Sequence, residues 1–192
     1  MLEQSRTRGR LARPPRRSDD LLRPGAATGA RFADARNNFG VALQGQGAFE
    51  EAIEQYRLAL ASHSGAVEVH LNLGTALSKL DRFDEALACY RHALSLDPYA
   101  AEAHFNAGNT YKAQGNVSAS IASFERAIVL RANYAEAHVN LGSAIGLRGD
   151  YAGAETHFRQ AAALKPNPTN LVALGGSLGA QNRLDEEEGF YR

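Results

Sequence analysis

A period of 34 residues runs through most of this 192-residue chain and limits what it can fold into. Segments 67–100, 101–134 and 135–167 align with one another, 33–66 fits the same frame without a gap, and a partial copy spans 168–192. Such a period is typical of stacked supersecondary units. One unit is too small to bury its own apolar face, so neighbouring units must pack into a continuous core.

Within each unit, apolar and small residues recur at helical spacing. Position 8 is glycine and position 24 is aromatic in all five copies, while positions 20 and 27 are mostly alanine. Small residues allow two antiparallel helices to approach closely, and the aromatic ring fills the remaining space. Position 15 is usually glycine, which suits the turn between the helices. Pro98 and Pro166 at position 32 stop the second helix.

This pattern resembles the tetratricopeptide repeat (TPR). In the fourth unit the matching residues are His138, Leu141, Gly142, Ile145, Ala154, Phe158, Ala161 and Pro166. The resemblance covers 33–192 and implies an all-α fold, a right-handed α-solenoid of about four and a half antiparallel helix pairs without strands. First helices are expected near 34–46, 68–80, 102–114, 136–148 and 169–181. Second helices are expected near 50–62, 84–96, 118–130 and 152–164.

Residues 1–32 have a different composition and are predicted to be a disordered tail. Positions 1–30 hold seven arginines and three acidic residues, together with several prolines and glycines, whereas the whole chain balances 21 basic against 21 acidic residues. Such a segment buries too little apolar surface to fold alone. An arginine-rich tail can bind an anionic surface or serve as a transit sequence, but a solvated tail is the simpler interpretation, and nucleic acid is not the expected partner.

Composition excludes several classes of protein. A single cysteine, Cys89, cannot close an intrachain disulfide. No apolar run reaches the ~18 residues of a membrane span, and the N-terminus lacks the apolar stretch of a secretory signal. The sequence therefore predicts a soluble cytoplasmic protein without a membrane contact.

Position 6 of the unit is the main candidate binding position. In the TPR family, the first helices line a concave groove, and position 6 faces it. The residues here are Asn38, Asn72, Asn106 and Asn140. An amide donates and accepts at once, so the row could hold the main chain of an extended polypeptide, with one amide for every ~3 residues of a strand. Alternatively, the amides bond locally and stabilise the helix stack.

Further groove-facing candidates accompany this row. Position 2 carries Asp34, Glu68, Glu102 and Glu136, and Asn109 stands at position 9. The carboxylates could orient a basic or hydroxyl-rich peptide. Acidic residues in a first turn also complement the helix dipole, which is the structural alternative.

Two sequence patterns resemble ligand-binding motifs, but neither is expected to bind a ligand. His70, His104 and His138 recur at position 4, one unit apart, too far from one another to share a metal ion. The glycine-rich stretch 175–179 lacks the lysine and the preceding strand of a phosphate-binding loop. No nucleophile–base pair is recognisable either, so no metal, cofactor or catalytic residue is expected.

These features predict a non-catalytic scaffold that binds an extended polypeptide. The phrases at 101–108 and 135–142 are similar to the superhelical repeats of O-linked N-acetylglucosamine transferases and their bacterial relatives, in which the asparagine row holds acceptor polypeptides. The alternative is therefore the substrate-recognition part of such a transferase. Arg192 falls inside the second helix of the fifth unit, which suggests a truncated chain whose uncapped end could self-associate.

Overall fold

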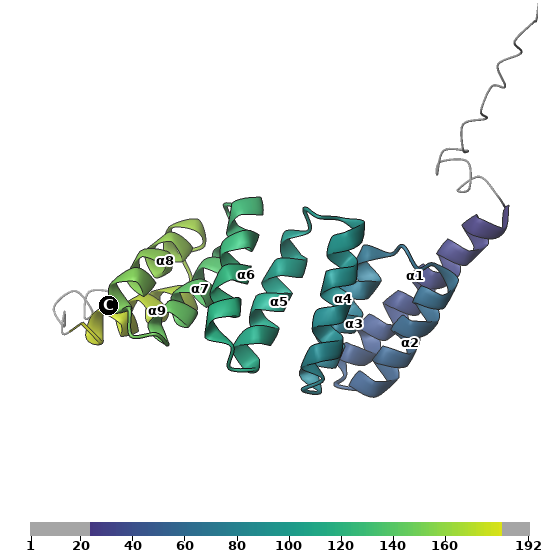
Figure 1. Ribbon diagram of the computed structural model, residues 1–192, viewed down its shortest axis with the longest axis horizontal. Coiled ribbons are helices and arrows are strands. Elements are labelled where there is room, and N and C mark those ends of the chain that lie inside the picture. The colour runs from purple at the N-terminus through teal and green to yellow at the C-terminus, as the bar shows by residue number, and fades with distance from the viewer. Residues whose placement is uncertain (1–23, 182–192) are drawn as a thin grey trace, which may run out of the picture.

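The computed structural model describes residues 24–181, in which every regular element is a helix and the helices follow one another in antiparallel pairs (Figure 1). The first helices of the five units are α1 (Pro24–Gly45), α3 (Val67–Lys79), α5 (Ala101–Ala113), α7 (Ala135–Gly146) and α9 (Pro168–Gly179). The second helices are α2 (Phe49–Ser62), α4 (Phe83–Leu96), α6 (Val117–Leu130) and α8 (Tyr151–Leu164).

The predicted fold class is confirmed. Helices α2 to α9 begin and end within two residues of the expected bounds. At the N-terminus the structure corrects the predicted boundary, because α1 begins at Pro24 rather than near residue 34. Proline is favourable in the first helical turn, and the alanines that follow it favour a helix. The rest of the predicted tail, 1–23, and the second helix of the fifth unit, 182–192, lie outside the described residues.

The turns inside each pair confirm the role of position 15. Gly47, Gly115 and Gly149 adopt positive φ angles of 80–83°, and Asp81 takes the same place with φ 56°. Glycine has no Cβ to oppose this conformation, and aspartate is among the few other residues that tolerate it. The second helix of each pair therefore starts at a fixed offset from the first.

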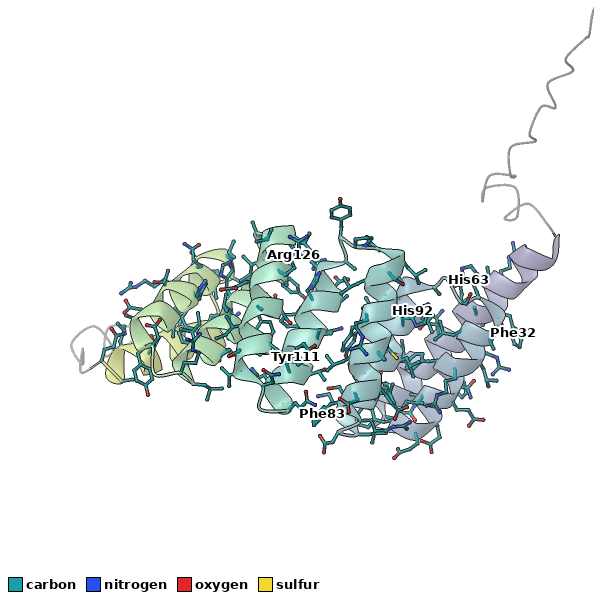
Figure 2. The ribbon with its side chains drawn as sticks, in the orientation of Figure 1. Phe32, His63, Phe83, His92, Tyr111 and Arg126 are labelled. Carbon is teal, nitrogen blue, oxygen red and sulfur yellow. The ribbon has the colours of Figure 1, made fainter. Side chains whose placement is uncertain are left out.

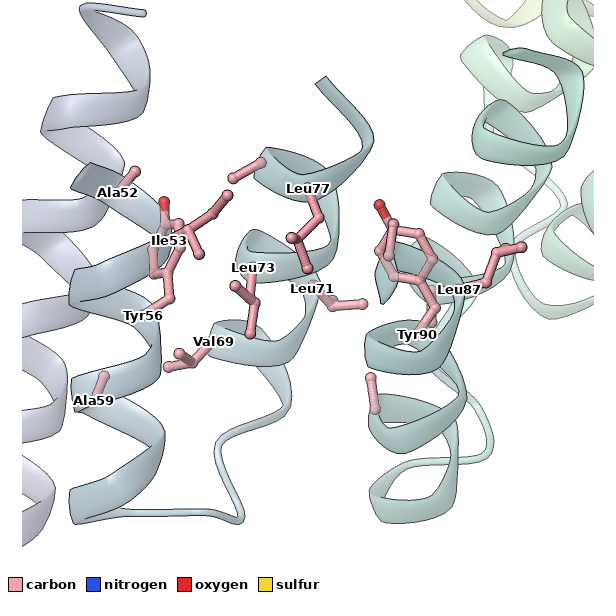
Figure 3. Packing of buried hydrophobic residues seen from close by; sticks show 14 of the residues in the cluster. Ala52, Ile53, Tyr56, Ala59, Val69, Leu71, Leu73, Leu77, Leu87 and Tyr90 are labelled. Atoms are coloured by element: carbon pink, nitrogen blue, oxygen red, sulfur yellow. The ribbon is translucent and has the colours of Figure 1, made fainter. Parts of the chain in front are cut away.

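Position 8 is where the two helices of a pair come closest. A Cβ atom on Gly40, Gly74, Gly108 or Gly142 would lie only 2.5–2.9 Å from the nearest ring atom of the aromatic residue at position 24. Two of these aromatic residues, Tyr56 and Tyr90, lie in the core shown in Figure 3. The periodic glycine thus makes room for the periodic ring.

Contacts between neighbouring helix pairs use a different face of each first helix, the face that carries position 7. Leu73 and Leu141 at position 7 are 6% and 1% exposed. In Figure 3, Leu73 and Val69 of α3 point toward Tyr56 and Ala59 of α2. Phe39 occupies the same position in α1 but is 55% exposed, because no described unit precedes α1. Position 7 is therefore an inter-repeat position.

The solenoid curves around its first helices. Successive first helices contact one another along the array (α1 with α3, α3 with α5, α5 with α7, α7 with α9), whereas no two described second helices do so. Elements that are closer together lie on the inner side of a bend. The odd-numbered helices therefore line the concave surface, and their outward-facing polar side chains form the candidate site.

Candidate functional site

The asparagine row is partly engaged in contacts between first helices. Asn72, Asn106 and Asn140 are half-buried, and Asn38 is exposed. Asn72 Nδ2 donates to Asn37 Oδ1 at 3.0 Å, and Asn106 Nδ2 to Thr75 Oγ1 at 3.4 Å. Asn140 Oδ1 accepts from Lys112 Nζ at 2.8 Å. None of these bonds involves a helix carbonyl, and each joins two neighbouring repeats.

These bonds belong to a wider polar network between α3 and α5. Thr110 Oγ1 donates to Ser78 Oγ at 3.0 Å, and the hydroxyl of Tyr90 lies 3.5 Å from Thr75 Oγ1. Tyr90 is buried in the helix pair, so its ring belongs to the core while its hydroxyl reaches the polar surface. Thr75, Ser78 and Thr110 in this network stand at positions 9, 12 and 10 of their units.

Glu68, Glu102 and Glu136 at position 2 lie in the first turns of α3, α5 and α7, which form the rim of the array, and each has an intramolecular partner. Glu102 Oε1 accepts from Arg131 Nη2 at 2.8 Å, and Glu136 Oε1 from Lys165 Nζ at 2.9 Å. Glu68 Oε1 accepts from Asn37 Nδ2 at 3.3 Å. The bond to Lys165 lowers the pKa of Glu136. The two ion pairs, Glu102–Arg131 and Glu136–Lys165, are solvent-exposed, so each contributes only ~0–1 kcal/mol to stability.

Two hollows contain residues of the predicted site. The first, of about 350 Å³, lies between α3 and α5 and includes Asn106, Asn109 and Lys79. The second, of about 260 Å³, lies between α7 and α9 and includes Asn140 and Glu136. The structure thus brings Asn106 and Asn109 together, and it places Asn140 at a separate point along the groove.

Comparisons with known proteins agree with this geometry. Two family models match the sequence, one described as "TPR repeat" over residues 76–115 and 108–146, and one as "Tetratricopeptide repeat" over residues 32–65. Together they cover more than half of the chain. The chain belongs to the tetratricopeptide repeat family. No curated protein matches it by sequence.

Solved TPR structures share the fold at low sequence identity. PilF of Pseudomonas aeruginosa is 20% identical with a TM-score of 0.78, over 87% of this chain and 75% of that one. MamA is 23% identical with a TM-score of 0.69, over 83% and 88%. YrrB, described as a TPR protein with an unusual peptide-binding site, is 17% identical with a TM-score of 0.63, over 90% and 87%. Each likeness establishes the fold alone.

The histidines at position 4 of this TPR array face the second helix of their own unit. The ring centroids of His70 and of His92, which Figure 2 labels on α4, lie 4.3 Å apart, and His138 Nδ1 lies 3.2 Å from His157 Nδ1. Among residues 24–181, no three side chains of the metal-ligating types gather, and no helix there is long and apolar enough to cross a membrane. Burial lowers the pKa of His70, His104, His138 and His157.

We expect the TPR array to lose stability between pH 7 and pH 5.5. These four histidines have folded-state pKa values below the unfolded value of about 6.5. The unfolded chain therefore takes up protons first as the pH falls through that value, which favours unfolding. Urea midpoints measured across this range test the expectation. The double variant His138→Gln/His157→Gln should show a shallower pH dependence, and an equal slope would contradict the assignment to this pair.

Several residues of the site escaped sequence analysis. Asn37, Thr75, Ser78 and Lys112 hold the asparagines or their neighbours, yet none recurs from repeat to repeat. Their only sequence signal is that positions 5, 9 and 12 of a TPR face the groove. Periodicity identifies residues that recur in every repeat. It does not identify residues that form a contact at only one interface between repeats.

Proposed function

We propose that this TPR array is a scaffold that binds an extended polypeptide along its concave surface. Asn38, Asn72, Asn106, Asn140 and Asn109 would contact the main chain of the ligand. Glu68, Glu102 and Glu136 would border the groove. The fold itself supports a role in protein–protein interaction, and the description of YrrB as a peptide-binding TPR protein is consistent with it.

The observation that carries the proposal is the chemistry of the inner surface. Amide and hydroxyl groups line the contacts between α3, α5 and α7, with the two hollows opening beside them. Each bond described for Asn72 and Asn106 uses one of the two N–H groups of that amide. The carbonyl oxygens of these amides can accept in addition. A polypeptide main chain presents both complementary groups at regular intervals.

The amide row also stabilises the array, so the test must separate binding from folding. Asn37 is buried and loses a donor when Asn72 is removed. Each lost hydrogen bond costs ~0.5–1.5 kcal/mol, and the better helix propensity of alanine offsets part of this cost. The variant Asn72→Ala/Asn106→Ala/Asn140→Ala should therefore remain folded, with a modest decrease in urea midpoint.

We expect the same triple variant to bind polypeptide about tenfold more weakly or worse, at ~0.5–1.5 kcal/mol per lost hydrogen bond. The ligand for calorimetry is a dodecapeptide selected from a randomised display library on the wild-type array. A second version of this peptide, N-methylated at alternate main-chain amides, should lose affinity for the wild type but little more for the triple variant.

The control is Asn133→Ala, since Asn133 is an exposed asparagine in the α6–α7 loop, outside the first helices that line the groove. It should leave affinity unchanged. Equal affinities of wild type and triple variant, with both folded, would make the asparagines purely structural. Failure to select any peptide would contradict the proposed function as a whole.

The transferase interpretation gains no support from the described residues. Asn38, Asn72, Asn106 and Asn140 would serve a scaffold and a substrate-recognition array equally well. The proposal above therefore concerns binding alone.

A further inference from the structure

The inner surface of the array has an unbalanced charge. At positions 5, 6, 9, 12 and 13 of the five first helices, the only charged residues are Lys79 and Lys112. Both are cations, and they lie in the last turns of the adjacent helices α3 and α5. The acidic residues of the first helices lie at position 2, near the opposite ends of these helices. The edge of the groove that the last turns of α3 and α5 form is therefore cationic.

Lys112 is half-buried without a carboxylate partner. Its Nζ donates to the neutral amide of Asn140 at 2.8 Å, and burial lowers the pKa of this lysine. No ion pair joins it to a carboxylate among the residues that the structure describes. By contrast, the rim cations Arg131 and Lys165 are paired with Glu102 and Glu136. Desolvating an ammonium group is costly unless an anion compensates it.

Lys79 lies beside donors that suit an anion. The hollow between α3 and α5 is lined by Thr75, Ser78, Lys79, Asn106, Asn109 and Thr110. Hydroxyl and amide groups can donate to a carboxylate, and the lysine supplies the opposite charge. The volume of about 350 Å³ can accommodate a side chain and is open to the groove. No acidic side chain lines this hollow.

The positions of the two lysines also have a structural explanation. Cations in a last helical turn are favoured by the helix dipole. This effect accounts for the presence of Lys79 and Lys112 in their helices. It does not account for the direction of Lys112, whose Nζ bonds a side chain of α7 instead of the carbonyls at the end of α5.

We propose that the groove over α3, α5 and α7 selects polypeptide segments that carry Asp or Glu side chains, which pair with Lys79 and Lys112. This inference rests on the proposed function and adds the chemical class of its ligand. The neutral amides would hold the main chain of any extended segment, and the two lysines would discriminate among segments by charge. Carboxylates placed against Lys112 would supply the counter-ion that the array itself lacks.

The experiment compares two fluorescent dodecapeptides of equal length with capped ends, (Glu-Ser)₆ and (Gln-Ser)₆. Anisotropy titrations with the wild-type array should show (Glu-Ser)₆ binding about tenfold or more tightly, as a charge-assisted hydrogen bond is worth more than a neutral one. Lys112→Met and Lys79→Met should each reduce this preference, and the double variant should abolish it. Methionine retains the apolar stem of lysine and removes its charge.

The control variant is Lys165→Met, which removes an exposed cation that pairs with Glu136 at the rim. It should leave the preference unchanged. Circular dichroism at 222 nm confirms that all variants remain helical. Because methionine keeps the packing of the stem, a loss of preference without a loss of (Gln-Ser)₆ binding assigns the effect to charge.

Five outcomes would overturn the inference. Equal affinity for both peptides would remove the charge preference and leave the proposed function intact. If neither peptide bound, the result would contradict both the charge preference and the proposed function. If the preference for (Glu-Ser)₆ persisted in the double variant, or fell equally in Lys165→Met, it would come from non-specific electrostatic attraction and not from Lys79 and Lys112. Tighter, Lys112-dependent binding of a single-stranded oligonucleotide would show that the lysines serve phosphates instead of a polypeptide.

Discussion

The Gly108→Leu variant is expected to be strongly destabilised and to fold only at low temperature or low denaturant. Even a single added Cβ would lie 2.6 Å from Cε1 and 2.7 Å from Cδ1 of Phe124. Phe124 is fully buried, so its ring cannot move aside without displacing the core around it. Overpacking of this kind costs ~1–3 kcal/mol, and the branched leucine side chain should reach the upper end or exceed it.

Urea unfolding followed by circular dichroism measures this effect. The matched control is Gly176→Ala, because Gly176 is also helical but an added Cβ there would meet no atom within 4 Å apart from the backbone of its own helix and its chain neighbours. This control should be neutral or more stable than the wild type by up to ~1 kcal/mol, since alanine is the better helix former. If Gly108→Leu and Gly176→Ala had the same midpoint, the close approach of α5 and α6 would be refuted.

Phe124→Ala should cost about 3–5 kcal/mol of unfolding free energy, the largest loss expected for a single residue here. The ring fills the space opposite Gly108 and also contacts Phe105, with ring centroids 5.8 Å apart. Its removal leaves a cavity between α5, α6 and the next repeat. The control Val129→Ala changes a side chain of the same helix that is 73% exposed, so its effect should stay within about 0.5 kcal/mol.

A double variant connects the two predictions. Shortening the ring in Phe124→Leu should relieve part of the clash that Gly108→Ala introduces, so the combined loss should be smaller than the sum of the single losses. Additive losses would show that the two positions do not contact each other. The same test can be applied to Gly74 and Tyr90, which repeat the contact one unit earlier.

The repeat made the fold predictable from sequence because each unit tests the interpretation of the others. Glycine at position 8 could be accidental in one helix, but four described copies oppose an aromatic ring. The start of α1 was harder to predict, because residues 24–32 precede the first full copy of the period. Their helical tendency comes from local composition. The arginines and prolines of the preceding segment led to the prediction of a disordered tail instead.

The candidate site was only partly predictable for a different physical reason. Helical spacing predicts that Asn72, Asn106 and Asn140 lie on the inner surface, and in the structure each of them bonds a side chain of a neighbouring first helix. Spacing within one helix says nothing of which side chain on the neighbouring helix comes within hydrogen-bond distance. The bond between Lys112 and Asn140 depends on the packing of α5 against α7. Such contacts across repeats decide whether an amide is available to a ligand.

The way the helices contact one another has a consequence for how this chain is made. Each described helix touches only helices one or two places away along the chain, so every tertiary contact joins segments close in sequence. Loop-closure entropy is therefore small at each step, and contacts of this kind form quickly. A repeat that has emerged from the ribosome already holds the complete surface on which the next one docks. The array can thus assemble in order during translation, without waiting for its C-terminal residues.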